Sequence, residues 1–204
     1  MNKLLALIPV VLALILGLAV ASQWWQPNVI ELKAATWLGD EQAKTLPDFK
    51  LTNHHGHPFT PQSIKGKWHL MFFGYTHCPD ICPDTMQMFG GMMKTFDRST
   101  LEKLQVTFVS VDPDRDTLEN MKQYATYFHP EILSVTGTMD QINVLTGATG
   151  ILHYKAATGD SENYEVAHSG TLILTDPQGR FIGLFSPPLD PRLIADDLEV
   201  LVNS

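Results

Sequence analysis

The chain has 204 residues, which is the length of one globular domain with a short appendage or of two small domains. Its charged fraction of 18% and hydrophobic fraction of 44% exclude an intrinsically disordered chain. The net charge of -8 excludes nucleic-acid binding, because a polyanion would be repelled and no basic stripe neutralises phosphates. The only two cysteines are too few for a four-thiolate zinc site or a disulfide-stapled small fold.

The chain opens with an uncharged apolar stretch, Leu4–Ala21. It approaches the roughly 20 residues that a membrane-spanning helix needs, and Lys3 before it places the N-terminus in the cytoplasm. Two tryptophans follow at positions 24 and 25, where aromatic side chains suit the membrane interface. We therefore expect residues 1–22 to form a single transmembrane anchor in the cytoplasmic (inner) membrane, with the rest of the chain in the periplasm or another extracytoplasmic space. A small-residue site, Ala19–Ala21, leaves a cleaved signal peptide as the alternative.

The segment after the anchor carries no sustained periodicity. Residues 23–45 have mixed polarity, which predicts a tether with at most a short helix, so the folded domain covers residues 46–204. In Phe49–Thr52, apolar and polar residues alternate, and a polar turn then leads to Phe59, which predicts a peripheral hairpin. Trp68–Phe73 is almost continuously apolar and ends at Gly74. This pattern predicts a central strand that is buried on both faces.

Helical and strand patterns alternate through the rest of the domain. Pro83 suits the first turn of a helix, and Gln105–Val111 has the β-branched composition of a second buried strand. Asp116 and Glu119 have capping-box spacing, which predicts a helix that runs to about Phe128.

The later elements complete the fold. They are a strand at Ile132–Val135, a helix at Met139–Leu145, a strand at Gly170–Thr175, a turn at Asp176–Gly179, a returning strand at Phe181–Phe185 and a final helix from Pro191. The order predicts an α/β fold, in which a thioredoxin-like mixed sheet is flanked by helices and preceded by an N-terminal hairpin and the N-terminal transmembrane helix.

Both cysteines lie where the predicted central strand meets the following helix, in the run GYTHCPDICP at residues 74–83. A helix N-terminus favours thiolate over thiol, so it lowers the pKa of a cysteine placed there. Because Cys82 follows Cys78 by four residues, the two sulfurs can lie on one side of the first turn and face one metal ion or each other. A structural disulfide would close a very short ring and stabilise the fold weakly, which favours a functional pair.

Three motifs in order carry a family resemblance: GYTHCPDICP at 74–83, SVDPDRDT at 110–117 and YEVAHS at 164–169. Together they resemble the Sco/SenC family of copper-binding proteins, over the length from Phe49 to the last helix and including the membrane segment. The resemblance implies that Cys78, Cys82 and His168 bind one copper ion. It further implies a role in assembling the binuclear copper centre of cytochrome c oxidase. The implied partners are the copper-accepting subunit of the oxidase and a second periplasmic copper carrier.

The donor set agrees with copper, because soft thiolates suit Cu(I) and an added imidazole allows Cu(II) as well. The alternative function is a thiol-disulfide oxidoreductase, in which Cys78 and Cys82 form a redox-active pair that keeps oxidase-subunit cysteines reduced. That activity would not require His168, and the sequence leaves open whether the protein is an enzyme. A peroxiredoxin-like peroxidase is disfavoured, because Thr76 lies two residues before Cys78 where that chemistry places it three before.

Other histidines are assigned outside the ligand set. His77 is expected to be solvated, and the cluster of His54, His55 and His57 is expected to be a hydrated turn rather than a weak copper or zinc site. Many family members carry an acidic residue directly before the ligand histidine, where this chain has Ala167, so any carboxylate that supports the site must come from elsewhere.

Two further groups are read mainly as structural. Residues Asp112–Asp116 are expected to form a turn with Asp116 as helix N-cap, although Asp112 or Arg115 could also steer a partner or set the charge of the site. The methionines of the first helix are expected to fill the core rather than to bind copper: Met86, Met88, Met92 and Met93.

Overall fold

The computed structural model describes residues 9, 13–18, 31–156 and 164–203. The chain divides into two compact units, Met1–Glu31 and Leu32–Ser204. Most of the expected Leu4–Ala21 anchor lies outside the described residues. Within the described part of the chain, we find no helix that combines the length and the apolar character of a membrane span.

The second unit is built on one mixed sheet in the order β1-β11-β10-β5-β6-β7-β3-β4, with β2 paired to β11. Three parallel strands form its centre, β5 (Trp68–Gly74), β6 (Leu104–Ser110) and β7 (Leu133–Thr136). The antiparallel strands are β1 (Thr36–Trp37), β2 (Lys44–Thr45), β3 (Leu51–Asn53), β4 (Pro58–Phe59), β10 (Leu172–Thr175) and β11 (Arg180–Phe185). Every residue of β5 after Trp68 is buried, as its continuous apolar run predicts.

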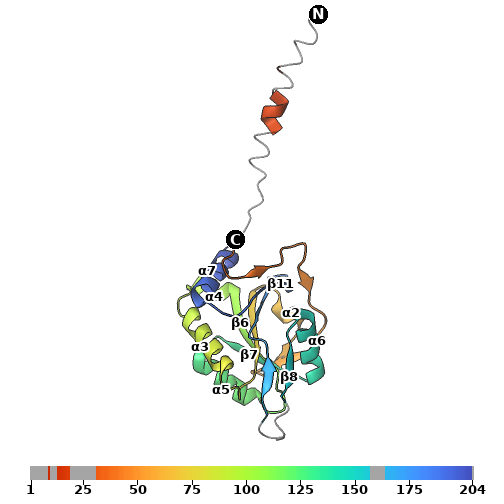
Figure 1. The fold of residues 1–204 in the computed structure, drawn as a ribbon, viewed down its shortest axis with the longest axis vertical. Helices are drawn as coiled ribbons and strands as arrows, with labels where there is room; N and C mark the ends of the chain where they lie inside the picture. The colour runs from red at the N-terminus through yellow and green to blue at the C-terminus, as the bar shows by residue number, and fades with distance from the viewer. Residues whose placement is uncertain (1–8, 10–12, 19–30, 157–163, 204) are drawn as a thin grey trace, which may run out of the picture. The chain divides into compact units, whose positions relative to one another are not determined.

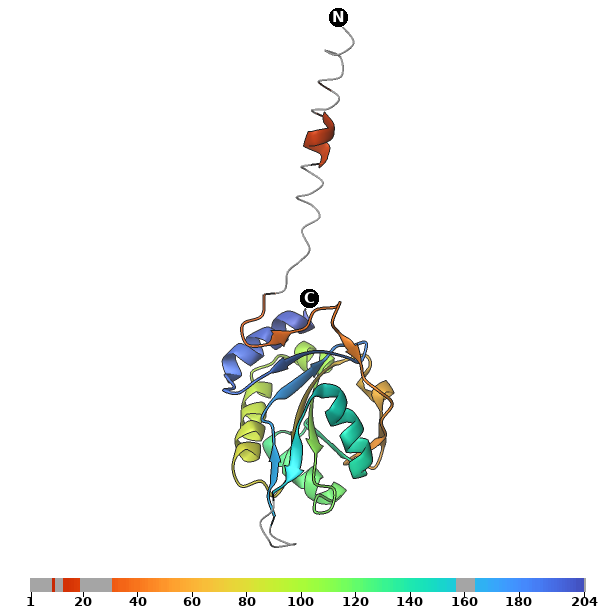
Figure 2. The ribbon, with the colours of Figure 1, turned by 45° about the vertical axis from the view of Figure 1, so that its right-hand side comes forward.

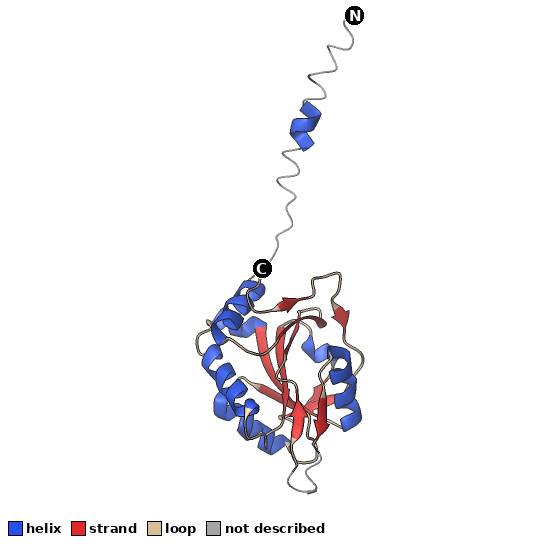
Figure 3. Ribbon diagram, viewed as in Figure 1, coloured by secondary structure: helices blue, strands red, loops and turns tan. Residues whose placement is uncertain are grey.

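Helices cover both faces of this sheet (Figure 1, Figure 3). On one side lie α3 (Ile81–Met93), α5 (Leu118–Phe128), α7 (Pro191–Val202) and the short α4 (Arg98–Lys103). On the other side lie α6 (Met139–Thr149) and the short α2 (Pro61–Ile64). Because β5, β6 and β7 are parallel neighbours, their two right-handed crossovers place α3 and α5 on the same face.

A separate two-stranded sheet stands beside this core. Its strands, β8 (His153–Lys155) and β9 (Val166–His168), pair antiparallel and place His153 opposite His168. In Figure 2 the two strands lie next to each other at the end of the domain where the described chain is interrupted. No described residue of this pair hydrogen-bonds into the main sheet ladder.

Most elements match the sequence expectations, including the peripheral hairpin, the central strand and the final helix, whose face of Ile194, Leu198, Leu201 and Val202 is buried. Helix α3 begins at Ile81, so Pro83 lies in its first turn, as expected. Other features differ: α6 runs four residues beyond Leu145 to Thr149, and neither the short α2 nor the β8–β9 pair was predicted. The sequence patterns also missed α4, which Asp97 caps through the Thr100 amide.

The segment expected as a tether contains ordered edge strands in its second part. Thr36–Trp37 and Lys44–Thr45 pair with β11, and the carboxylate of Asp197 accepts the backbone N–H groups of residues 33–35 at 2.7–2.9 Å. These contacts join the start of the described segment to α7. Strands of two residues are too short to show a period, which is why the sequence pattern did not predict them.

Candidate metal centre

The cysteine loop lies at the carboxyl end of β5. The strand ends at Gly74, and α3 begins at Ile81 with Asp80 as the N-cap residue, so Cys82 is the second residue of the helix. Cys82 is fully buried, whereas Cys78 is half-buried, and both thiols are free. The loop therefore presents one accessible sulfur above one enclosed sulfur.

The imidazole of His168 comes from a segment far from the two cysteines in the sequence. His168, the last residue of β9, brings Nε2 to 3.2 Å from Cys82 Sγ, across a separation of 86 residues. Its Nδ1 lies 3.4 Å from the Ser169 carbonyl oxygen, and because a carbonyl can only accept, Nδ1 carries the proton. The lone pair of Nε2 is then directed at the sulfurs, which is the tautomer that a metal ligand needs.

Cys78, Cys82 and His168 form one group, and their ligand atoms all lie within 4.8 Å of one another. Metal–sulfur and metal–nitrogen bonds of about 2.0–2.3 Å keep ligand atoms within about 4.6 Å of one another, so the three donors could hold one ion with little backbone movement. The structure thus brings together all three residues that the sequence singled out. Aromatic rings enclose the imidazole, with Phe72 at 5.7 Å and Tyr75 at 5.9 Å between ring centroids.

The two cysteines differ electrostatically. Hydrogen bonding from Cys82 lowers the pKa of Cys78 against the opposing effect of burial, and the backbone N–H groups of Asp80 and Cys82 lower it further. The same hydrogen bond to Cys78, together with burial, raises the pKa of Cys82. The pair therefore shares one proton, which lies on the buried sulfur. The lowered pKa expected at this helix N-terminus applies to Cys78 alone.

Asp116 supports the cysteine loop and does not cap the helix after it. The N-cap of α5 is Thr117, whose hydroxyl accepts from the Asn120 amide, so the expected capping box at Asp116 and Glu119 is wrong. The buried Asp116 carboxylate instead accepts the hydroxyls of Thr76 and Ser110, each at 2.6 Å, and the Thr76 amide. The capping pattern is local, whereas this contact spans 40 residues, so spacing alone could not reveal it.

Asp112 and Arg115 are part of the interior rather than a surface that steers a partner. Asp112 is fully buried and the Arg115 side chain is 17% exposed. Both contact Tyr164, a residue that no sequence signal had singled out except its place in the third motif. The expectation of a turn at Asp112–Asp116 holds, because the Arg115 and Asp116 amides donate to the Asp112 carbonyl.

The remaining histidines lie outside the metal group. His77 is half-exposed, with Nδ1 at 3.1 Å from the Thr76 hydroxyl and 3.6 Å from Asp116. His54, however, is buried, so the expectation of a hydrated turn is wrong at this position. Its Nδ1 accepts from the Ser134 amide at 3.1 Å, and its Nε2–H therefore donates to His55 Nε2 at 3.0 Å. Of the helix methionines, Met86, Met92 and Met93 are buried as expected, whereas Met88 is only partly buried.

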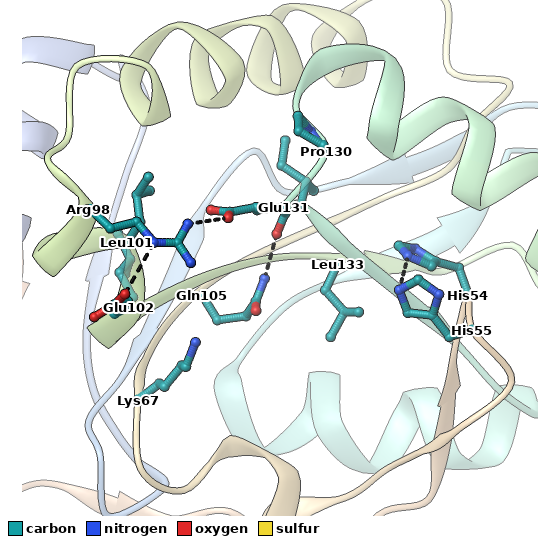
Figure 4. A pocket seen from close by; sticks show the side chains of 12 residues that line it. His54, His55, Lys67, Arg98, Leu101, Glu102, Gln105, Pro130, Glu131 and Leu133 are labelled. Atoms are coloured by element: carbon teal, nitrogen blue, oxygen red, sulfur yellow. Dashed lines mark hydrogen bonds and ion pairs between the residues drawn. The ribbon is translucent and has the colours of Figure 1, made fainter.

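A separate hollow of about 270 Å³ lies at the opposite edge of the parallel strands, where Lys67 precedes β5 and Leu104 and Leu133 begin β6 and β7. Figure 4 shows Arg98 held between Glu102 and Glu131, at 3.2 and 2.8 Å. Its guanidinium is thus paired with two carboxylates, and the hollow lacks the thiol donors of the cysteine edge. The carboxyl end of β5, with its two thiols and one imidazole, is therefore the candidate functional site.

Comparisons with known proteins show the family and the fold of this chain. A family model described as SCO1/SenC matches residues 39–203. The SCO2 protein of Saccharomyces cerevisiae is 38% identical over 137 residues, which are 66% of this chain and 45% of that protein. This chain thus spans less than half of the length of that relative.

Two solved structures share the fold. The apo Sco1 protein of Thermus thermophilus has a TM-score of 0.75 at 30% identity, covering 86% of this chain and 99% of the other. The ScoI protein of Bradyrhizobium japonicum, solved with copper bound, has a TM-score of 0.67 at 32% identity, covering 77% of this chain and 99% of the other. Both confirm the mixed sheet with flanking helices.

Proposed function

The chain belongs to the SCO1/SenC family, and from that premise we propose that it is a membrane-anchored copper chaperone. It binds one copper ion through Cys78, Cys82 and His168. It passes the ion to the copper-accepting subunit of cytochrome c oxidase while the binuclear copper centre is assembled. The observation that carries the proposal is the convergence of two thiol sulfurs and one imidazole nitrogen within 4.8 Å.

The donor chemistry supports copper as the cargo. Two soft sulfurs suit Cu(I), and the imidazole, with its Nε2 lone pair directed at Cys82, extends the site to Cu(II). Binding releases the proton shared by the two sulfurs, since metal ligands must be deprotonated. Three protein ligands leave a coordination position open on the side of the half-exposed Cys78, where an acceptor protein can attack.

The proposed location follows from the sequence of the first segment. The Leu4–Ala21 stretch holds the chain in the cytoplasmic membrane, and the copper domain then lies in the periplasm or an equivalent extracytoplasmic space. An oxidase subunit that receives copper at the outer face of that membrane is within reach of such a domain. A second copper carrier in the same compartment would supply the ion.

One observation favours a second candidate, a thiol-disulfide oxidoreductase. Cys78 is half-exposed with a lowered pKa, and Cys82 is buried beside it with a raised pKa, which is the arrangement of an attacking and a resolving thiol. The two functions share their sulfurs, and the pair cannot bind Cu(I) while it is oxidised to a disulfide. His168 separates them, because only the chaperone requires the nitrogen ligand.

The experiment compares His168→Ala, Cys78→Ser and a control, His153→Ala, in cells and with purified full-length protein. His153 is the cross-strand neighbour of His168 but lies outside the metal group. A chaperone predicts that His168→Ala and Cys78→Ser lose oxidase copper-centre assembly to the same degree, with partial rescue by added copper, and that His153→Ala retains it. Full assembly in the His168→Ala strain, together with loss in the Cys78→Ser strain, would replace the chaperone with the thiol reductase.

A further inference from the structure

One loop contacts both parts of the candidate metal centre. We call the segment with Cys78 and Cys82 the cysteine half and the segment with His168 the histidine half. The 110–117 loop, which joins β6 to α5, fixes the cysteine half through Asp116, whose carboxylate accepts from Thr76 two residues before Cys78. The same loop reaches the histidine half through Asp112 and Arg115. This loop therefore contacts both the cysteine side and the histidine side of the site.

The contacts to the histidine half converge on Tyr164. The Tyr164 hydroxyl donates to Asp112 Oδ1 at 2.6 Å, and Arg115 Nη1 donates to the Tyr164 carbonyl at 2.9 Å. The guanidinium carbon of Arg115 lies 3.7 Å from the centroid of the Tyr164 ring, and Arg115 Nε pairs with Asp112 Oδ2 at 2.5 Å. Arg115 thus holds both the backbone and the ring of Tyr164.

His168 follows Tyr164 by four residues, and its ring also packs against Phe72 and Tyr75. It ends the three-residue strand β9, which pairs only with β8 and stands apart from the main sheet. A two-stranded sheet of this length is not stable by itself in water. Its position relative to the cysteines must therefore come from its attachments to the domain, and the partly buried Arg115 contacts to Tyr164 are one of them.

We propose that Arg115 is the positioning residue that sets where His168 lies relative to Cys78 and Cys82. Without the contacts of Arg115 to Tyr164, β9 moves away from the cysteines. The site then keeps two sulfur ligands but loses the nitrogen ligand. Because two thiolates still suit Cu(I), whereas Cu(II) needs the imidazole, Arg115 decides whether the site can hold both oxidation states. This inference rests on the proposed copper function.

The chemistry of the contact favours a positioning role over a purely stabilising one. A largely enclosed ion pair such as Arg115–Asp112 contributes little net stability, because taking its charges out of water offsets their attraction. The guanidinium fixes the orientation of Tyr164, because its planar fork contacts the Asp112 carboxylate and the carbonyl and ring of Tyr164 at the same time. Lysine keeps the charge but has no such fork, so we expect that Arg115→Lys does not restore the site.

The test uses the full-length protein in two states. In the metal-free protein, Arg115→Gln should speed hydrogen exchange at the Ala156 and Ser169 amides, which donate to the Glu165 and Leu152 carbonyls, by at least about 10-fold. The Val111 amide, which donates to the Gly74 carbonyl in the core, should not change.

In the copper-loaded protein, Cu(II) affinity should fall by about 10- to 100-fold and the nitrogen coupling in the electron paramagnetic resonance spectrum should disappear. Cu(I) affinity should stay within a few-fold of wild type.

The matched control is Arg98→Gln, which removes an equivalent side chain from two surface ion pairs at the opposite edge of the sheet. It should leave every readout unchanged. If Arg115→Gln does not fold, Arg115→Lys replaces it, since it keeps a positive charge beside Asp112 but lacks the planar fork, and it should give the same changes.

Two results would overturn the inference. One is unchanged hydrogen exchange at Ala156 and Ser169 with the nitrogen coupling intact. The other is an equal loss of Cu(I) and Cu(II), which would mean that Arg115 acts on the cysteine half. If the wild-type protein binds no copper, the proposed function fails, whereas the hydrogen-exchange comparison still decides the positioning role.

Discussion

Gly74 and Cys82 are packed so closely that a Cβ atom on Gly74 would lie 2.6 Å from the Cys82 sulfur. The same Cβ would meet rings of the core, Phe108 at 3.0 Å and Phe72 at 3.1 Å. The end of β5 therefore accepts only glycine, because any side chain here would displace the buried sulfur or the rings beside it. The close approach joins the packing of the sheet to the geometry of the metal centre.

Gly74→Ala should weaken copper binding and reduce the free energy of unfolding by about 1–3 kcal/mol, because an added methyl group overpacks a filled core. Copper titration and urea denaturation of the variant check the two effects. Wild-type affinity together with wild-type stability would contradict the close packing of Gly74 against Cys82.

Alanine substitutions at two neighbouring glycines of α3, Gly90 and Gly91, should change the stability of the domain in opposite directions. A Cβ on Gly90 would lie 2.5 Å from the Phe128 carbonyl oxygen of α5, whereas a Cβ on Gly91 would meet nothing within 4 Å. Gly90→Ala should therefore destabilise the domain by forcing α3 and α5 apart. Gly91→Ala should stabilise it by about 0.5–1 kcal/mol through helix propensity alone. Thermal or urea unfolding of the two variants side by side gives the comparison, and equal shifts of the same sign would contradict the α3–α5 contact.

Asp116→Asn should loosen the cysteine loop. The carboxylate accepts from two hydroxyls and one amide while only 2% exposed, and an asparagine offers one acceptor oxygen to these three donors. We expect the free energy of unfolding to fall by about 2 kcal/mol, since hydrogen bonds to a charged group are among the stronger ones. Faster exchange of the Thr76 amide would locate the change.

The control for that variant is Asp114→Asn in the same loop. Asp114 is 67% exposed and pairs with Lys155 at the surface, so its replacement should change stability by less than about 1 kcal/mol. If both variants lose the same free energy, the burial of Asp116 does not explain its effect.

His69 predicts acid sensitivity of the fold. Burial in β5, with a smaller effect of Lys67, lowers the pKa of His69 to about 4, against about 6.5 in an unfolded chain. The unfolded state binds more protons between these values, so stability is fully present above pH 6.5 and decreases as the pH falls toward 4. The loss amounts to about 3 kcal/mol. Urea denaturation across this pH window measures it.

His69→Gln should flatten that pH dependence, because the buried position no longer titrates. The exposed His57→Gln variant should keep the wild-type slope. An unchanged slope in His69→Gln would assign the acid sensitivity to other groups.

Local sequence patterns were enough to predict much of the fold. The apolar stretches of β5 and β6 predict buried central strands, the Asp176–Gly179 turn and the following apolar run predict the return through β11, and Pro191 marks the start of α7. The CxxxC spacing and the two later motifs indicated the family and the candidate donor residues. These features are local, so a single stretch of chain contains all the information that they need.

Only the tertiary structure decided how the site is assembled. Strands β8 and β9 have three residues each, which is too short to show an alternating pattern of apolar and polar residues. The local sequence therefore did not predict that His168 lies on a strand. The roles of Asp116 and Arg115 depend on partners 40 and 49 residues away. His168 reaches Cys82 across 86 residues because the 110–117 loop and the sheet order bring the two ends together. Such distances follow from how the elements pack, and residue spacing along the chain does not encode them.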